Sequence, residues 1–215
     1  KSSVYKESNE STAAWLRIAE LRADQIDTIP FDDGEFKNCL NEIRDLSNKP
    51  AAVFEPIMRK KCSQAGVALV FVPELERTHL CGVTQWLTQK KAMIALSLRY
   101  KMNDHFWFTF FHEAAHILLH GKKEIFLDLK DSDGANKESQ ANAFAANHLI
   151  PEKEYKFFIT SHKNIFKNDI IIFSKNIGVH PGIVVGRLQH DKYIKHQWHN
   201  DLKTKFDFVP HYNNL

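Results

Sequence analysis

A glutamate stands between two histidines in the segment His112-Glu113-Ala114-Ala115-His116, which is the HExxH pattern. On an α-helix, residues four apart lie about 40° apart around the axis and roughly one turn along it. The imidazoles of His112 and His116 can therefore bind one Zn²⁺ ion. Glu113, at the neighbouring edge, can accept a proton from a metal-bound water. The spacing predicts a zinc-dependent hydrolase that attacks a carbonyl group.

The composition of the chain allows a competing interpretation, because twelve histidines make a chance spacing of four residues plausible. The flanking segments 106–111 and 117–119 are apolar, however, so the predicted helix is hydrophobic on nearly every side and should be buried. Buried histidine and glutamate need polar partners, and a metal ion can supply them. Imidazole and carboxylate must hold that metal, because Cys39, Cys62 and Cys81 are widely spaced and are expected to be reduced thiols.

A catalytic zinc usually has three protein ligands and an open position, so a third ligand is expected. His120 lies four residues after His116, but the helix should end near Gly121, which favours a place beside the site. Glu138 heads a predicted helix face that is otherwise lined mainly by small side chains, and such a face lets two helices approach closely. Glu138 is therefore the predicted third ligand, and the alternative is a solvated glutamate on an alanine-rich helix. The shared face consists of Glu138, Ala141, Asn142, Ala145 and Leu149.

Hydrophobic periodicity predicts helices, then a small mixed or antiparallel sheet, then further helices, which is an α+β fold. Predicted helices cover 13–26 (capped by Ser11 or Thr12), 35–46, 51–65 (closed by Gly66), 103–120, 136–150, 152–160, 168–176 and 181–189, and predicted strands cover 67–72, 79–87 and 92–98. We expect a linker over 1–12, a helical N-terminal segment over 13–65, and a metallopeptidase domain with a helical C-terminal part over 66–215.

The overall composition suits a single domain, or a domain with a helical appendage, in a chain of 215 residues. The net charge of +3 neither requires nor excludes nucleic acid. Apolar stretches are far shorter than the roughly 20 residues of a membrane helix, and no apolar segment opens the chain. We therefore expect a cytoplasmic protein without a membrane partner. The polar start at Lys1, without Met, suggests that an upstream domain has been removed.

Three segments together resemble the ImmA/IrrE family of zinc metallopeptidases, over about 66–190. They are His112-Glu113-Ala114-Ala115-His116-Ile117-Leu118-Leu119-His120, Glu138-Ser139-Gln140-Ala141-Asn142-Ala143-Phe144-Ala145, and Leu149-Ile150-Pro151. The resemblance implies a zincin-like fold, with His112, His116 and Glu138 as zinc ligands and Glu113 as catalytic base. The family often has glycine where Ala115 stands and an acidic residue where Gln140 stands. Neither difference touches a proposed ligand.

The family resemblance also implies a function. Its members are regulatory proteases that cleave helix-turn-helix repressors, and many similar chains carry an upstream Xre-type or HigA-like helix-turn-helix domain. We therefore expect a cytoplasmic zinc metalloendopeptidase, tied to transcription regulation or a toxin-antitoxin system, that cleaves a repressor and contacts DNA only through an upstream domain. The alternative is a non-proteolytic zinc-containing sensor or antitoxin-type regulator that binds a partner. Glu113 favours the enzyme, because a purely structural zinc site has no use for a base there.

Two parts of the site stay open at this level. An oxyanion stabiliser is expected, and five residues qualify by type: Tyr100, His105, His148, His180 and His190. An edge strand is also expected to pair with an extended substrate. The segment 92–98, which precedes the HExxH helix, is the candidate, and an interior strand is the equally weighted alternative.

The segment 173–189 has the order helix, glycine turn, helix, which is also the order of a DNA-reading helix-turn-helix. Its second helix is rich in isoleucine and valine and offers few base-reading side chains. Packing against the rest of the domain is therefore the preferred interpretation, with Arg187 in a structural role.

Overall fold

The computed structural model describes residues 9–97, 99–121 and 132–206, and within them the α+β prediction is confirmed. No described helix combines the length and apolar character that crossing a membrane requires. The helices are α1 (Asn9–Asp24), α2 (Asp33–Arg44), α3 (Ala51–Ser63), α4 (Asn103–His120), α5 (Ser132–Leu149), α6 (Glu152–Ser161), α7 (Lys167–Ile177) and α8 (Pro181–His190), with short 3-10 turns at Asp45–Asn48 and Asn200–Leu202; the strands are β1 (Val67–Phe71), β2 (Gly82–Thr88) and β3 (Lys91–Leu96).

The three strands form one mixed sheet in the order β1-β3-β2. β1 runs parallel to β3, with Val67 opposite Ala92, and β2 runs antiparallel to β3, with Thr84 opposite Ile94. The prediction that 92–98 provides an edge strand is therefore wrong, because β3 is paired on both sides. Within the described residues, β2 is the edge strand on that side of the sheet.

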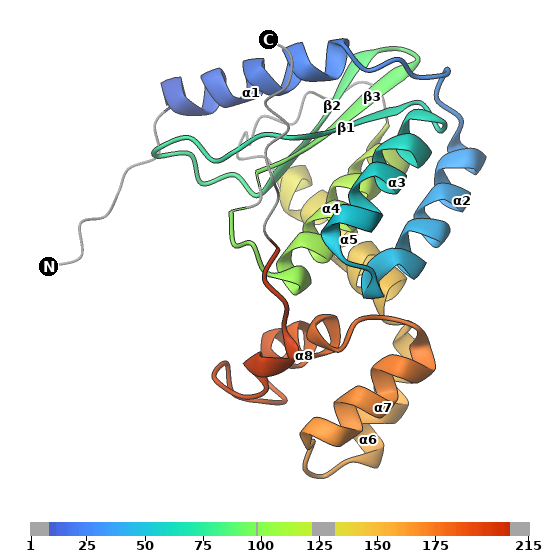
Figure 1. Ribbon diagram of the computed structural model, residues 1–215, viewed down its shortest axis with the longest axis vertical. Helices are drawn as coiled ribbons and strands as arrows, with labels where there is room; N and C mark the ends of the chain where they lie inside the picture. The colour runs from blue at the N-terminus through green and yellow to red at the C-terminus, as the bar shows by residue number, and fades with distance from the viewer. Residues whose placement is uncertain (1–8, 98, 122–131, 207–215) are drawn as a thin grey trace, which may run out of the picture.

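The two faces of the sheet are covered by different helices (Figure 1). α1 lies along one face, where its Trp15 and Ala19 pack with Val70 and Met93. The Trp15 indole N–H donates to the carbonyl of Val72 at 3.2 Å, which ties α1 to the end of β1. α3, α4 and α5 lie on the opposite side of the sheet, so the HExxH helix belongs to the larger of the two cores.

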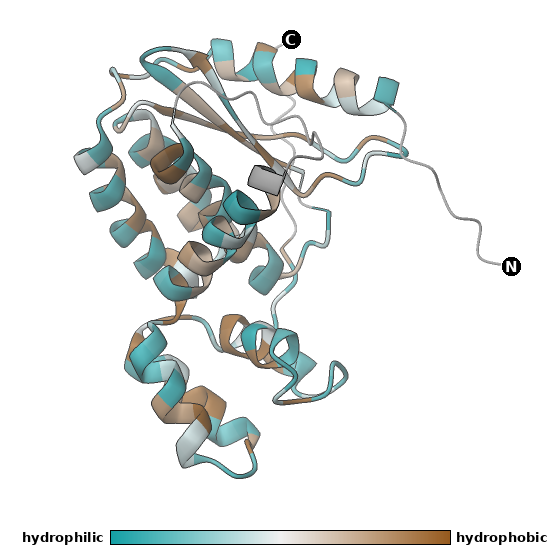
Figure 2. Ribbon diagram, turned by 180° about the vertical axis from the view of Figure 1, so that it is seen from behind, coloured by the Kyte–Doolittle hydropathy of each residue, from teal (hydrophilic) through white to brown (hydrophobic). Residues whose placement is uncertain are grey.

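α4 forms the centre of the larger core. Trp107, Phe110 and Phe111 are fully buried, and Phe54 of α3 packs against Trp107 with ring centroids 4.9 Å apart. β1 and β3 consist almost entirely of apolar, buried residues, whereas β2 mixes polar and apolar ones (Figure 2). α2 and α3 contribute to this same core, and the predicted boundary near residue 66 stays a prediction.

Several element boundaries differ from the sequence-based predictions. α1 begins at Asn9, so Ser11 and Thr12 lie inside the helix and do not cap it, and β2 covers 82–88 where a strand over 79–87 was expected. Gly66 has φ +82°, and a Cβ there would lie 2.2 Å from the Cα of Phe31. Only glycine fits this turn into β1, because the backbone is left-handed and the Phe31 main chain lies against it.

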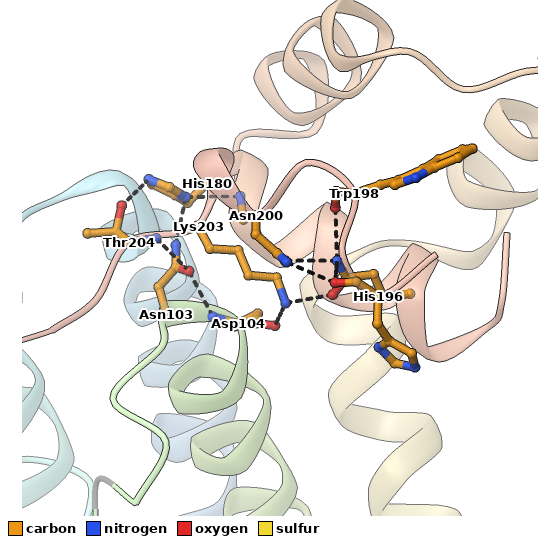
Figure 3. Close-up of polar contacts among 10 residues, drawn as sticks. Asn103, Asp104, His180, His196, Trp198, Asn200, Lys203 and Thr204 are labelled. Carbon is orange, nitrogen blue, oxygen red and sulfur yellow. Dashed lines mark hydrogen bonds and ion pairs between the residues drawn. The ribbon is translucent and has the colours of Figure 1, made fainter. Parts of the chain in front are cut away.

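A segment near the C-terminus fastens the first turn of α4 (Figure 3). The ammonium group of Lys203 lies 2.6 Å from Asp104 Oδ2, and both side chains are more than nine-tenths buried. On the other side of the turn, the side-chain Nδ2 of Asn103 lies 2.7 Å from His180 Nδ1. The main-chain N–H of Asn103 donates to the carbonyl of Thr204. We name this arrangement of Asn103, Asp104, His180, Lys203 and Thr204 the α4 anchor.

Two glycines of α8 allow it to pack against the α4 anchor. A Cβ at Gly182 would lie 2.6 Å from Asn103 Oδ1, and a Cβ at Gly186 would lie 2.7 Å from both Cβ and Oδ2 of Asp104. These separations are shorter than van der Waals contact. The spacing of four residues therefore places two gaps on one face of α8, and the side chains of α4 fill them.

We expect Gly186→Ala to destabilise the protein by about 1–3 kcal/mol, because the added methyl group displaces the buried Asp104–Lys203 pair. The free energy of unfolding from urea titration measures the effect. Gly34→Ala in the first turn of α2 is the control. Its methyl group would meet only Oδ1 of the exposed Asp32, at 3.3 Å. Equal stability changes in the two variants would show that the α4–α8 contact tolerates a side chain.

Candidate metal and catalytic site

α4 and α5 bring the three predicted metal ligands together. His112 and His116 lie on one face of α4, with their Nε2 atoms 3.1 Å apart. Glu138 of α5 places Oε2 3.2 Å from His112 Nε2 and Oε1 3.3 Å from His116 Nε2. Within the described residues, these are the three side chains that form a metal-type cluster of histidine, cysteine and carboxylate groups.

The donor atoms fit a divalent metal ion. Two ligands about 2.0–2.1 Å from a tetrahedral centre lie about 3.3 Å from one another, and the three measured separations are close to that value. Burial lowers the pKa of His112, and it lowers the pKa of His116 to about 4. Both imidazoles are therefore neutral near pH 7, the form in which a ring nitrogen can bind a metal.

Further polar contacts orient the two imidazoles. Asn142 Oδ1 lies 3.0 Å from His112 Nδ1, so the ring donates from Nδ1 and keeps the Nε2 lone pair toward the cluster. His116 Nδ1 contacts His120 Nδ1 at 2.9 Å, and His120 Nε2 lies 3.3 Å from Gln140 Oε1. His120 thus lies beside the site, as its position near the helix end suggests. The cluster itself consists of His112, His116 and Glu138.

Glu113 is buried against the sheet. Its side chain is 7% exposed, and the Thr84 hydroxyl of β2 lies 2.9 Å from Glu113 Oε2 and 2.8 Å from the Glu113 carbonyl. Burial raises the pKa of Glu113 to about 8 in the absence of a metal ion. A hydroxyl has one proton, so Thr84 can donate it to the carbonyl and accept a hydrogen bond from the protonated carboxyl group.

Gly82 provides the space that the Glu113 side chain occupies. A Cβ at Gly82 would lie 2.8 Å from both Cγ and Oε1 of Glu113, and 2.8 Å from Cγ2 of Thr109. The sequence alone indicates no role for Gly82, Thr84 or Asn142. Asn142 could have been found, because it lies one turn after Glu138 on the face that was identified. The two β2 residues gave no such signal, since they meet α4 from far along the chain, and the contact of Thr84 with Glu113 spans 29 residues.

The five candidate oxyanion stabilisers lie in different places. The rings of Tyr100 and His105 contact one another at the start of α4 in a tilted arrangement, with centroids 4.7 Å apart. His148 packs between Phe111 and Phe144, and His180 belongs to the α4 anchor. His190 is exposed and pairs with Asp191. None of the five is among the three clustered ligands, and the assignment of an oxyanion stabiliser stays open.

The helix–glycine–helix segment consists of α7, Gly178 and α8. Gly178 has the left-handed φ of +76° that ends α7. α8 buries Val184, Val185 and Leu188 fully, so the helix that would read DNA packs inside the domain. Arg187 of α8 pairs with Asp191 at 2.6 Å and lies over the ring of Tyr155 of α6. These contacts give Arg187 a structural role, because they join the two helices.

The geometry of two imidazoles, a carboxylate and a buried glutamate on paired helices defines a metallopeptidase-type site. Residues 64–169 match the Peptidase_M78 family model, which describes the IrrE N-terminal-like domain. The match spans just under half of the chain and includes both helices of the site. It supports the resemblance to the ImmA/IrrE family and a metallopeptidase-type function. The search of curated proteins finds no match to the chain.

In protein stripped of metal by a chelator, we expect Glu113→Gln to raise the free energy of unfolding, by an amount that increases with pH. The folded carboxyl has a pKa of about 8, against an ordinary value of 4.5, so its contribution to stability falls as pH rises between these values. The amide does not titrate. Urea titration measures the difference in unfolding free energy between the two proteins. That difference should be up to about 2 kcal/mol larger at pH 7 than at pH 5. A difference independent of pH would contradict the raised pKa.

Proposed function

We propose that this chain is a zinc-dependent endopeptidase that cleaves a protein regulator of the helix-turn-helix repressor type. The observation that carries the proposal is the cluster of His112, His116 and Glu138, whose donor atoms lie 3.1 to 3.3 Å apart beside the buried Glu113. Two histidines and one carboxylate are the ligand set of catalytic zinc in several peptidases, in which a fourth position is left for water or substrate. The family match supports the same class of reaction.

The residues around the cluster would have separate roles in the reaction. A bound zinc ion would polarise the substrate carbonyl and lower the pKa of a water molecule. Glu113 would accept a proton from that water, and the nearby positive charge would favour its ionised form. Thr84 could then donate its proton to Oε2 of the ionised carboxylate, leaving Oε1, next to Gly82, to take up the proton. Asn142 would hold His112 in the orientation that binding requires.

The location of β2 supports a polypeptide substrate. Among the described residues, β2 is the edge strand beside Glu113, and an extended chain can add to such an edge through main-chain hydrogen bonds. We therefore propose that β2, in place of 92–98, is the edge strand that pairs with an extended substrate. The choice of a repressor as substrate comes from the family resemblance. We propose that DNA contact, where it occurs, belongs to an upstream domain.

Glu113→Gln is expected to keep zinc and to lose cleavage, because the amide has the size of the carboxyl group and cannot accept the proton. The assay follows cleavage of a purified helix-turn-helix repressor, by gel and mass spectrometry, with zinc measured on the same samples. Removal of base catalysis should slow cleavage by about 10²–10⁴-fold. If the variant cuts as fast as the wild type, Glu113 is not the base. If neither protein cuts while both bind zinc, the non-proteolytic regulator is the better description.

Zinc content distinguishes the ligands from their neighbours. The wild type should hold one zinc ion per chain, and His116→Ala and Glu138→Ala should lose it. His120→Ala should retain stoichiometric zinc. Asn142→Ala should weaken affinity by about 10–100-fold, because His112 loses the acceptor that orients it. Elemental analysis and competition with a chromogenic chelator measure both quantities. Loss of zinc in His120→Ala with retention in Glu138→Ala would reverse the ligand assignment.

A further inference from the structure

A small pocket lies next to the catalytic glutamate, at the N-terminal end of α4. Leu96 and Phe106 are almost completely buried at its base, and the half-buried Cys81 and Thr109 form its walls. It adjoins the site through Gly82, which follows Cys81 in the chain and lies against both Thr109 and Glu113. The remaining lining residues are Arg99, Tyr100, Lys101 and His105.

The rim of this pocket is basic and aromatic. Arg99 is held in place by its bond to the carbonyl of His79 at 2.7 Å and by Glu74 at 3.4 Å, which offsets part of its charge. Lys101 is exposed, and the described part of the chain contains no carboxylate within ion-pair distance of its ammonium group. The pocket therefore combines an apolar base with a positively charged rim.

The backbone fixes the position of Lys101. Its φ is +53°, a left-handed conformation that costs a non-glycine residue about 1 kcal/mol or more. Main-chain contacts on both sides maintain it: the Phe206 amide donates to the Lys101 carbonyl, and Met102 bridges to Lys205. The buried Phe206 ring packs against Phe54 and Phe106. The C-terminal segment thus holds a lysine at the pocket rim.

Helix geometry relates the pocket to the site. Thr109 and His105 line the pocket and lie three and seven residues before His112, which is about 5 Å and about 10 Å along the axis of α4. An extended polypeptide advances about 3.3 Å per residue, so a substrate bound at the cluster would place a side chain at the pocket no more than about three residues from the scissile bond.

We propose that this pocket is a substrate subsite that selects an acidic side chain, preferably glutamate, about three residues from the scissile bond. The aliphatic part of a glutamate side chain would contact Leu96 and Phe106, and its carboxylate would pair with Lys101. This assignment rests on the proposed peptidase function for its meaning, but the binding step can be tested without cleavage.

The test uses two pools of fluorescein-labelled octapeptides built on alanine, with a single glutamate or a single glutamine at each position in turn. Binding to the 215-residue chain carrying Glu113→Gln and loaded with zinc is followed by fluorescence anisotropy at low salt. We expect the glutamate pool to bind about fivefold more tightly than the glutamine pool, which is the upper range for one exposed ion pair. Lys101→Glu, added to Glu113→Gln, should abolish this preference.

The control is Lys153→Glu in the same background, which makes an identical charge change on the exposed surface of α6. It should retain the preference, because α6 lies away from the start of α4 (Figure 1). Lys101→Glu keeps a Cβ at the left-handed position, so backbone strain is unchanged. Equal binding of the two pools, or equal loss in both lysine variants, would refute the subsite.

Cleavage by the wild-type protein tests the subsite independently of the binding assay. When the wild type is incubated with a proteome-derived peptide library, the cleaved peptides should be enriched in acidic residues at one fixed position about three residues from the cut. Cutting without this enrichment overturns the subsite and leaves the peptidase function in place. Selective binding of the glutamate pool without any cutting overturns the peptidase function and retains the acidic site.

Discussion

The close approach of α4 and α5 is the constraint on which the site depends. Two imidazoles on one helix supply only two donors, and the third must come from a helix near enough for a carboxylate to reach both nitrogens. Ala141 and Ala145 of α5 are fully buried, as is Ala115 of α4. These small side chains let the two helices pack closely, and larger ones would separate Glu138 from the histidines. The metal-type cluster is therefore a consequence of alanine packing as much as of the HExxH spacing.

The second constraint is the burial of Glu113 against β2. An acid in an apolar environment holds its proton, and here the pKa rises to about 8. A carboxyl group that keeps its proton near pH 7 cannot accept another one until a nearby positive charge favours its ionised form. The same burial that destabilises the ionised form also keeps the carboxylate within reach of the cluster, with Gly82 making room and Thr84 fixing one oxygen. In the proposed mechanism, metal binding would therefore control whether Glu113 is ionised and able to act as the base.

The sequence determined the helix-borne part of the site more completely than the strand-borne part. The helical period places His112, Glu113 and His116 relative to one another, and a face of small residues indicates Glu138. Hydrophobic periodicity contains no information on strand order, however. The parallel pairing of β1 with β3 places 92–98 in the middle of the sheet, which neither segment reveals alone. The contacts of β2 with Glu113 follow from that order, so they became visible only in three dimensions.

Because α4 carries both the metal-type cluster and the pocket, its position must be fixed along its whole length. Thr84 holds its middle through Glu113, and the contact of His120 with Gln140 joins its end to α5. At its start, the attraction between Lys203 and Asp104 offsets part of the cost of removing two charges from water, and Lys203 also donates to Gln189 Oε1. A buried ion pair contributes little to net stability compared with apolar packing, but it tolerates few alternative geometries. The α4 anchor therefore fixes the position of the first turn of α4 relative to α8 and the segment that contains Lys203. The pocket at this end of α4 is thereby held at a constant distance from the cluster.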